Sequence, residues 1–190
     1  MKILAIETCF SSSSLCLFCD GNFFEKIDHH KNNQATSLPI FTQDLIIKNN
    51  IKIKELDAVI VNHGPGSFTG IRIGIAFALG LVTPFKIPLY GVSSLENFVL
   101  DDFKTTIAIK AIGENYYVQQ FEGGYEVDDV QYLSFENLPQ GTLTIGNPGD
   151  LVTAQRLIRR FFFKKPQEYK EPLYVRSVNA VIGKTKIIKN

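Results

Sequence analysis

The segment VIVNHGPGSFTGIRIG, residues 59–74, decides the fold class. It runs from a short apolar stretch, through three glycines in seven residues, into a second apolar stretch. A short apolar run bounded by turn residues is typical of a buried strand, and the glycines indicate a tight loop before a helix. The segment therefore predicts a strand–loop–helix unit of an α/β protein.

The glycine loop approaches three known motifs and completes none of them. Gly70 comes one residue too late for a dinucleotide-binding fingerprint, and it is not followed by the Lys-Ser/Thr pair of a P-loop. Gly66 directly precedes Ser67, which excludes a nucleophile elbow. Two interpretations stay open. The free N–H groups at the helix start form an anion cradle, or Ser67 or Thr69 simply caps a turn.

The helix after the loop, to about residue 82, carries small residues every four positions on two faces. One face has Gly70, Gly74 and Ala78, and the other has Ala76 and Gly80. Glycine inside a helix costs roughly 1 kcal/mol relative to alanine, so close approach of another element is expected to offset that cost. The helix is almost wholly apolar, which indicates either a core helix or an interface helix.

An interface is the preferred interpretation, shared with an amphipathic helix near residues 36–49. Thr36 or Ser37 is expected to cap that earlier helix, with Pro39 in its first turn. The residues predicted to face a partner are Leu38, Phe41, Leu45, Gly70, Ile71, Gly74 and Ala78. The alternative is that the glycine-rich helix lies within the core of its own chain.

The remaining segments predict an α/β fold with mixed sheets. Strands are expected at 2–8, 13–20 and 21–28, and Asp20-Gly21 is a hairpin signal. Further strands are expected at 107–112, 116–123 and 142–146, followed by a helix after Asp150. We expect two lobes, residues 1–102 and 103–190. The smaller second lobe has a tail that is free to pack back on the first.

Composition is that of a soluble globular protein. Of 190 residues, 45% are hydrophobic and 21% charged, and the formal net charge is +1, which excludes disorder and a strong global field. No signal peptide is recognised and no run approaches the roughly 18 apolar residues of a membrane span, so a cytoplasmic protein without membrane contact is expected. Cys16 and Cys19 form a C-x-x-C, but their odd spacing on a strand points them to opposite faces and favours packing.

Four segments together resemble the TsaB (YeaZ) family of bacterial tRNA threonylcarbamoyladenosine synthesis. They are GPGSFTGIRIG (64–74), ILAIETCFSSSSLCL (3–17), IPLYGVSSLE (87–96) and PLYVRSVNAV (172–181). The resemblance implies the ribonuclease-H-like, actin-like ATPase fold with a reduced second lobe. It also implies a phosphate-binding ancestry for a weak cofactor site at Thr8, Ser11, Gly64, Gly66 and Ser67.

The resemblance further implies a non-catalytic scaffold. Such a subunit pairs through its N-lobe helices with the catalytic paralogue TsaD, which holds ATP and metal. It forms homodimers through the same surface, works with the ATPase TsaE, and meets tRNA through the complex. It needs no cofactor of its own. The chain lacks an i,i+4 histidine pair, because Asn33 and Gln34 lie four residues after His29 and His30.

The chain departs from the family pattern at two positions, and one other function stays open. Lys110 and Ile112 stand where the family's second lobe carries an acid and an arginine. The alternative function is a free-standing ATP-dependent kinase of the same superfamily, which needs carboxylates such as Glu7 facing a cleft. From Asp150 onward ten Lys/Arg oppose three Asp/Glu. These basic residues could contact tRNA phosphates. The alternative is that they form the outer face of a helix whose phenylalanines pack inward.

Overall fold

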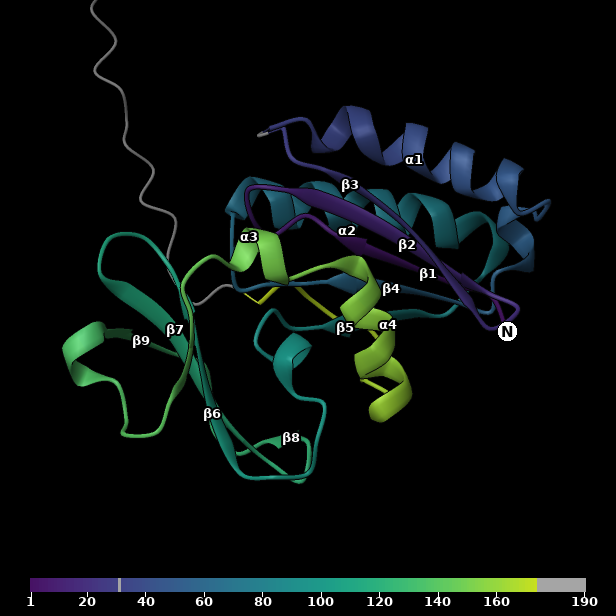
Figure 1. The fold of residues 1–190 in the computed structure, drawn as a ribbon. Coiled ribbons are helices and arrows are strands. Elements are labelled where there is room, and N and C mark those ends of the chain that lie inside the picture. Colours follow the sequence, from purple (N-terminus) through teal and green to yellow (C-terminus); the bar gives the residue numbers. More distant parts are fainter. Residues whose placement is uncertain (31, 174–190) are drawn as a thin grey trace, which may run out of the picture.

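The computed structural model describes residues 1–30 and 32–173, which form two mixed β-sheets (Figure 1). The first sheet has helices on both faces, and the second packs at one end of it. This arrangement confirms the predicted α/β class with mixed sheets. Most of the predicted closing motif, 172–181, lies outside the described residues.

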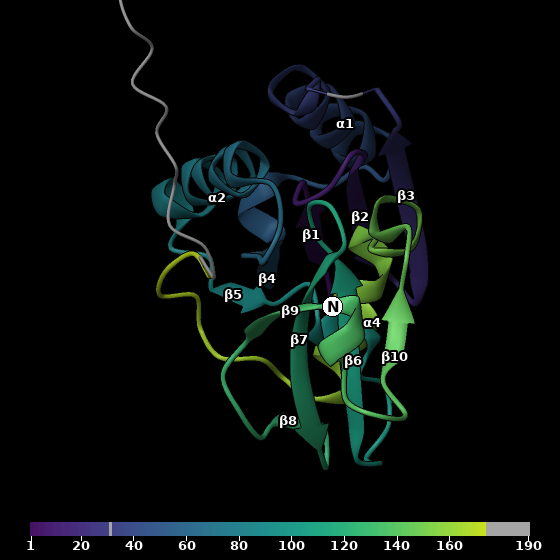
Figure 2. The same cartoon turned by 90° about the vertical axis from the view of Figure 1, so that its left-hand side faces the viewer.

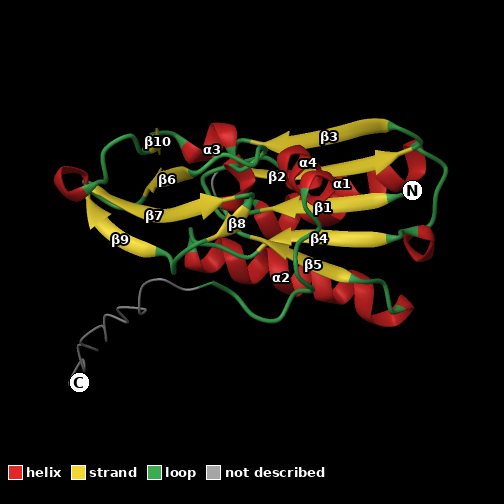
Figure 3. Cartoon of the chain, turned by 90° about the horizontal axis from the view of Figure 1, so that it is seen from below, coloured by secondary structure: helices red, strands yellow, loops and turns green. Residues whose placement is uncertain are grey.

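The first sheet has the strand order β3-β2-β1-β4-β5. Its strands are β1 Ile3–Glu7, β2 Ser13–Cys19, β3 Asn22–Asp28, β4 Ala58–Asn62 and β5 Leu89–Val92. The first three form an antiparallel meander, and Asp20 and Gly21 at its turn both have positive φ, 51° and 81°, as the hairpin signal predicts. Strands β4 and β5 extend the sheet in parallel with β1 (Figure 3).

Helices cover both faces of this sheet. On one face lie α1 Gln34–Lys48 and α2 Phe68–Val82, side by side in Figures 1 and 2. On the other face lies α4 Ala154–Phe163, which contacts β1, β2 and β4. Alternate residues of the strands therefore pack into separate apolar clusters on the two sides. Cys16 lies in one cluster and Cys19 in the other, which confirms that the C-x-x-C cysteines are packing residues.

The two helix starts differ in how well the sequence predicted them. Ser67 caps α2, since its Oγ accepts from the Gly70 N–H at 3.2 Å, and α2 ends at Val82 as expected. The predicted caps of α1, Thr36 or Ser37, are wrong, because the helix already begins after Asn33. Asn33 is fixed there by its side-chain bond to Asp28. That contact, from the end of β3, starts α1 early and leaves Pro39 inside the helix.

The second sheet has the order β10-β6-β7-β8, with β9 also paired to β7. Its strands are β6 Thr105–Lys110, β7 Asn115–Glu122, β8 Tyr125–Glu126, β9 Gln131–Ser134 and β10 Leu143–Ile145. Short helical turns complete the chain: η1 Ile53–Glu55, η2 Thr83–Phe85, η3 Glu96–Phe98, η4 Phe135–Asn137 and α3 Pro148–Leu151. The lobe boundary near 101–104 stays a prediction, but α4 follows the second sheet in sequence and packs on the first.

The stretch Phe68–Phe85, which is α2 with its 3-10 extension, is long and apolar enough to cross a membrane by length and composition. The stretch meets this criterion on its average hydropathy, since Thr69, Arg72 and Thr83 interrupt it, so it is not the uninterrupted run of apolar residues that the sequence was expected to lack. Core helices of soluble proteins meet the same criterion. In this structure α2 packs on β4 and α1, so the measure is weak evidence for a span.

The two small-residue faces of α2 have different surroundings. Gly70 and Gly74 are buried, and a Cβ at either position would collide with Thr8, with its backbone oxygen at Gly70 and its side-chain oxygen at Gly74. A Cβ at Gly80 would meet nothing within 4 Å. The glycines of the first face are thus explained by close approach of the turn after β1.

This difference predicts opposite effects for two otherwise identical substitutions. Gly70→Ala places a methyl group against a backbone carbonyl that cannot yield, so it should destabilise the protein by about 1–3 kcal/mol. Gly80→Ala meets open space, and helix propensity should make it neutral or stabilising by up to ~1 kcal/mol. Urea unfolding of the two variants checks both signs. Equal effects would contradict the contact with Thr8.

Candidate functional site

The glycine loop uses its own hydrogen-bond donors. The Ser67 N–H donates to the Cys9 carbonyl at 2.7 Å, and the Gly64 N–H donates to Asn62 Oδ1 at 3.0 Å. Gly66 faces Cys9 so closely that a Cβ would collide with it, and a Cβ at Gly64 would lie 2.6 Å from the Leu173 oxygen. The geometry favours the capped turn over the anion cradle, because these donors already have partners.

The turn after β1 also contacts its own chain. Thr8 is fully buried, and its hydroxyl donates to the Gly70 carbonyl at 2.7 Å. Ser11 is exposed, but it lies against Gly149, and the neighbouring Ser12 hydroxyl donates to the Gly149 carbonyl. The five predicted cofactor residues are thus brought to one region where the chain packs on itself. A nucleotide at that region stays a prediction.

Glu7 ends β1 within a buried polar network. Its Oε1 accepts from the Cys9 N–H at 2.5 Å, and its Oε2 accepts from the Asn62 side-chain amide. Asn62 also donates to the Ser94 hydroxyl at 3.0 Å. The network joins Glu7 at the end of β1 and Asn62 at the end of β4 to Ser94, which follows β5. All three side chains are almost wholly buried. The carboxylate therefore ties strands together and does not face solvent.

Burial governs the acidity of this carboxyl group. Loss of hydration raises the pKa of Glu7 from its ordinary 4.5 to about 7, and the hydrogen bonds from Asn62 and Cys9 only partly oppose the shift. The folded state consequently retains a proton on Glu7 between about pH 4.5 and 7, where the unfolded chain has already released it. A Mg²⁺-binding carboxylate of a kinase would instead be ionised and open to its cleft.

The histidines do not converge. The His30 imidazole contacts Asp28 at 2.7 Å, whereas His63 lies beside the glycine loop and contacts the Glu171 carbonyl at 3.2 Å. Burial lowers the pKa of His63. Within residues 1–30 and 32–173, no group of three or more His, Cys, Asp or Glu side chains is placed to hold a metal ion.

The two departures in the second lobe have local explanations. Lys110 forms an ion pair with Glu114 at 3.4 Å and lies over the Tyr116 ring at 5.3 Å. Ile112 lies in the β6–β7 turn and is 72% exposed. Neither side chain supplies the acid or the arginine that the family resemblance would place there.

The predicted partner-facing residues turn mostly inward. Leu38, Leu45, Ile71 and Ala78 are buried in the core between the first sheet and its two helices, and Gly70 and Gly74 face Thr8. Only Phe41 is partly accessible. In this chain these residues therefore belong to its own core, which is the alternative that the sequence left open, and their part in a partner interface stays a prediction. Both faces of α2 show the same spacing, and the face that packs inward is selected by the distant turn after β1.

The outward surface of the two helices is apolar as well, and it consists of other residues. We call it the outer helix face. Its exposed members are Ile40 and Ile47 on α1, Ala76, Leu79 and Gly80 on α2, and Phe85 just beyond α2. The second small-residue stripe, Ala76 and Gly80, thus lies where a partner has access. The sequence showed this stripe as well, but the residues predicted to face a partner were taken from the other face of α2.

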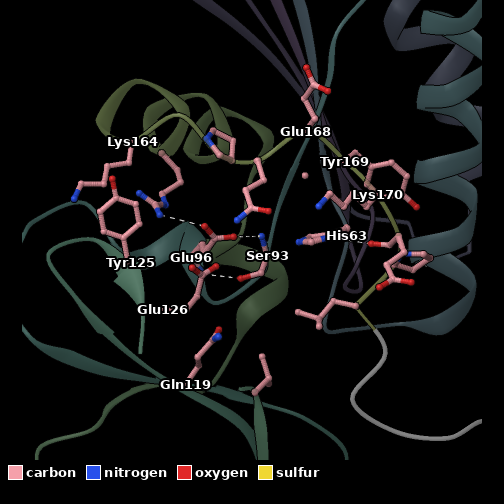
Figure 4. A pocket seen from close by; sticks show the side chains of 18 of the residues that line it. His63, Ser93, Glu96, Gln119, Tyr125, Glu126, Lys164, Glu168, Tyr169 and Lys170 are labelled. Atoms are coloured by element: carbon pink, nitrogen blue, oxygen red, sulfur yellow. Dashed lines mark hydrogen bonds and ion pairs between the residues drawn. The ribbon is translucent and has the colours of Figure 1, made fainter. Parts of the chain in front are cut away.

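A cavity of about 480 Å³ lies between the lobes, at the carboxyl ends of the parallel strands β4 and β5 (Figure 4). Ligands of open α/β sheets commonly bind at this end of the strands. Polar side chains from both lobes point toward it, among them His63, Ser93, Glu96, Gln119 and Glu126. Arg160 also lines it. Residues 164–173 close one side by running along β5, where the Gly91 N–H donates to the Gln167 carbonyl.

The basic residues of α4 are largely engaged within the protein. Arg160 is 2% exposed and pairs with Glu96, and Arg156 lies over the Phe98 ring at 4.8 Å. Phe162, by contrast, is 45% exposed. The expected basic outer face with inward phenylalanines is therefore only partly correct, and Arg160 is not available for a tRNA phosphate.

Both the fold and the sequence of this chain are similar to those of known proteins. Two Pseudomonas aeruginosa structures share the whole two-lobed α/β architecture. One is described as an uncharacterized protein with similarity to peptidase YEAZ (TM-score 0.76, 21% identity, 92% of this chain and 99% of that one). The other is described as YeaZ (TM-score 0.74, 20% identity, with the same coverages). The chain thus has the fold of YeaZ, a two-lobed α/β fold with mixed sheets as the sequence predicted.

The model of the TsaD family, tRNA N6-adenosine threonylcarbamoyltransferase, matches residues 28–169, and the chain belongs to this family. The Escherichia coli K12 protein TsaB is 34% identical over 95 residues, covering 50% of this chain and 41% of TsaB. A Fervidobacterium nodosum tRNA N6-adenosine threonylcarbamoyltransferase is 26% identical over 206 residues, covering 89% of this chain and 60% of the relative. The chain thus spans about half the length of these relatives, and the resemblance to TsaB and YeaZ is confirmed.

The buried Glu7 predicts an unusual pH dependence of stability. Because the pKa of Glu7 is raised on folding, the folded state binds more protons between about pH 4.5 and 7, and stability falls as pH rises through this window. The shift corresponds to an upper limit of ~3 kcal/mol. Glu7→Gln should remove this component, so the gap in stability between variant and wild type should shift in favour of the variant from about pH 5 to pH 7 and level off above that. Urea unfolding at several pH values measures it, and parallel stability curves would contradict the assignment.

Proposed function

We propose that this chain is a non-catalytic scaffold subunit in bacterial tRNA threonylcarbamoyladenosine biosynthesis. It binds the catalytic paralogue TsaD and supports transfer of the threonylcarbamoyl group to tRNA. The observation that carries the proposal is the outer helix face: α1 and α2 lie side by side (Figure 2), and each of them exposes apolar side chains. Relatives named TsaB for this biosynthesis, which align with about half of the chain, support the assignment.

The surface fits helix-to-helix docking. Ala76 and Gly80 lie one turn apart on the exposed side of α2, so a partner helix can approach closely between them. Leu79 stands beside them at 41% exposure and offers apolar area to bury. The same surface can pair two copies of this chain, so homodimer and heterodimer would compete for it. The ATPase TsaE would join the TsaD pair, and ATP and metal would belong to the partner subunit.

The kinase alternative has less support. Glu7, its candidate carboxylate, is 1% exposed and accepts two internal hydrogen bonds. The phosphate-hairpin residue Thr8 is fully buried against α2. Both groups would have to leave their present partners before they could contact a nucleotide and Mg²⁺.

The test is reconstitution with TsaD and TsaE of the same organism, tRNA, threonylcarbamoyl-adenylate and ATP, with and without this chain. Ala76→Arg and Leu79→Glu each place a charge on the outer helix face and should reduce co-purification with TsaD and tRNA modification by at least tenfold. They should leave the unfolding midpoint near that of the wild type. An added charge at a buried apolar contact is costly because it loses hydration.

Ile112→Glu is the matched control for Leu79→Glu, since it adds the same negative charge at an exposed apolar residue of the second lobe. Glu7→Gln tests for chemistry and should support full modification. The proposal fails if the chain is dispensable, if the control is as harmful as Leu79→Glu, or if Glu7→Gln abolishes modification while the complex still forms.

A further inference from the structure

We propose that the last turn of α4 is a latch that fixes the second lobe against the first and thereby sets the width of the cavity between them. The latch consists of Arg160 on α4, Lys164 directly after α4, Glu96 on η3, and the Gly123-Gly124 turn between β7 and β8. It is separate from the outer helix face, and its existence does not depend on the proposed scaffold role.

Arg160 connects the two lobes through a single guanidinium nitrogen. Its Nη2 donates to Glu96 Oε1 at 3.1 Å and to the Gly124 carbonyl at 2.7 Å. Glu96 is itself held in the first lobe, because its other oxygen accepts from the Ser93 N–H at 2.8 Å. Both side chains are more than nine-tenths buried. Charge-assisted bonds away from water are stronger and more selective in geometry than exposed pairs.

Lys164, four residues after Arg160, binds the same Gly123-Gly124 turn. Its ammonium donates to the Gly123 carbonyl, lies 3.4 Å from Asp102 and stands 3.8 Å from the centre of the Tyr125 ring. The turn therefore presents two successive carbonyls to two cations at the C-terminal end of α4. Figure 4 shows Arg160's partner Glu96 and the pair Lys164 and Tyr125 along one wall of the cavity.

The shape of the turn matches this contact. A Cβ on Gly124 would lie 2.9 Å from Lys164 Cδ and 2.9 Å from Phe163 Cε1, whereas a Cβ on Gly123 would meet nothing within 4 Å. Both glycines have positive φ, 80° and 60°. Only one of two equally unusual backbone positions is thus pressed against α4.

These contacts place α4 between the lobes as a fixed spacer. The helix is anchored on the first sheet by Ala154, Leu157 and Ile158, which are fully buried in the cluster beneath it. The second lobe reaches that helix through the β7–β8 turn. Hinge motion that widens the cavity has to separate Gly124 from Arg160 and Gly123 from Lys164, which keeps the lobes at one spacing.

The two glycines provide a matched pair for the test. Gly124→Ala and Gly123→Ala incur similar backbone strain, but only the former adds a methyl group against the Lys164 and Phe163 side chains that contact the turn. Gly124→Ala should raise hydrogen-exchange rates of the β7 and β8 amides at least tenfold above those of Gly123→Ala. It should also increase the radius of gyration measured by small-angle scattering. Equal exchange and equal radii in the two variants would overturn the latch.

Arg160→Met provides an independent variant with Arg159→Met as its control, because Arg159 is the exposed neighbour on the same helix. Replacing a buried charge by an apolar side chain of similar length can leave global stability nearly unchanged. Arg160→Met should therefore release the second lobe, seen as faster exchange in β7 and β8 with β1 and β4 still protected. Uniform loss of protection in both sheets would show a general folding role and contradict the latch.

Discussion

The structure depends on the contact between the turn after β1 and the start of α2. Thr8 and Cys9 reach the helix so closely that residues 66, 70 and 74 have no room for a side chain. The Thr8 hydroxyl and the Cys9 carbonyl then fix the loop by hydrogen bonds to Gly70 and Ser67. Dense packing of this kind is sensitive to a single added methyl group. It places α2 on the sheet and determines which side of the helix stays outside.

This contact explains how a loop with the appearance of a phosphate cradle serves the fold. Anion binding at a helix start requires N–H groups that point to open space. Here the donors of Gly64, Ser67 and Gly70 go to a side-chain amide, a carbonyl and a hydroxyl of the same chain. The glycines allow the turn after β1 to approach the loop and α2 closely. The hydrogen bonds of Asn62 to Glu7 and Gly64 join the loop to the sheet.

Local signals in the sequence predicted the parts that local physics decides. The hairpin at Asp20-Gly21, the Ser67 cap and the end of α2 at Val82 each depend on neighbouring residues, and each was correct. The exposed face of α2 was not predicted, because both stripes repeat every four residues and the choice between them is made by Thr8, 62 positions from Gly70. The start of α1 failed for the same reason, since Asp28 fixes Asn33 from another element.

The role of Arg160 could not be predicted from its neighbours in the sequence either, because its charge is paired with distant residues. In the sequence it belongs to a basic, phenylalanine-rich helix, which suggests a surface for phosphate groups. In the fold it is buried against Glu96 and the Gly124 carbonyl, and the exposed residue is Phe162. A cation excluded from water and held by two lobes stabilises one arrangement of the chain more than it attracts a distant ligand. The proposed scaffold role agrees with both features, because buried ion pairs hold the lobes together and the outer helix face leaves apolar side chains accessible to a partner.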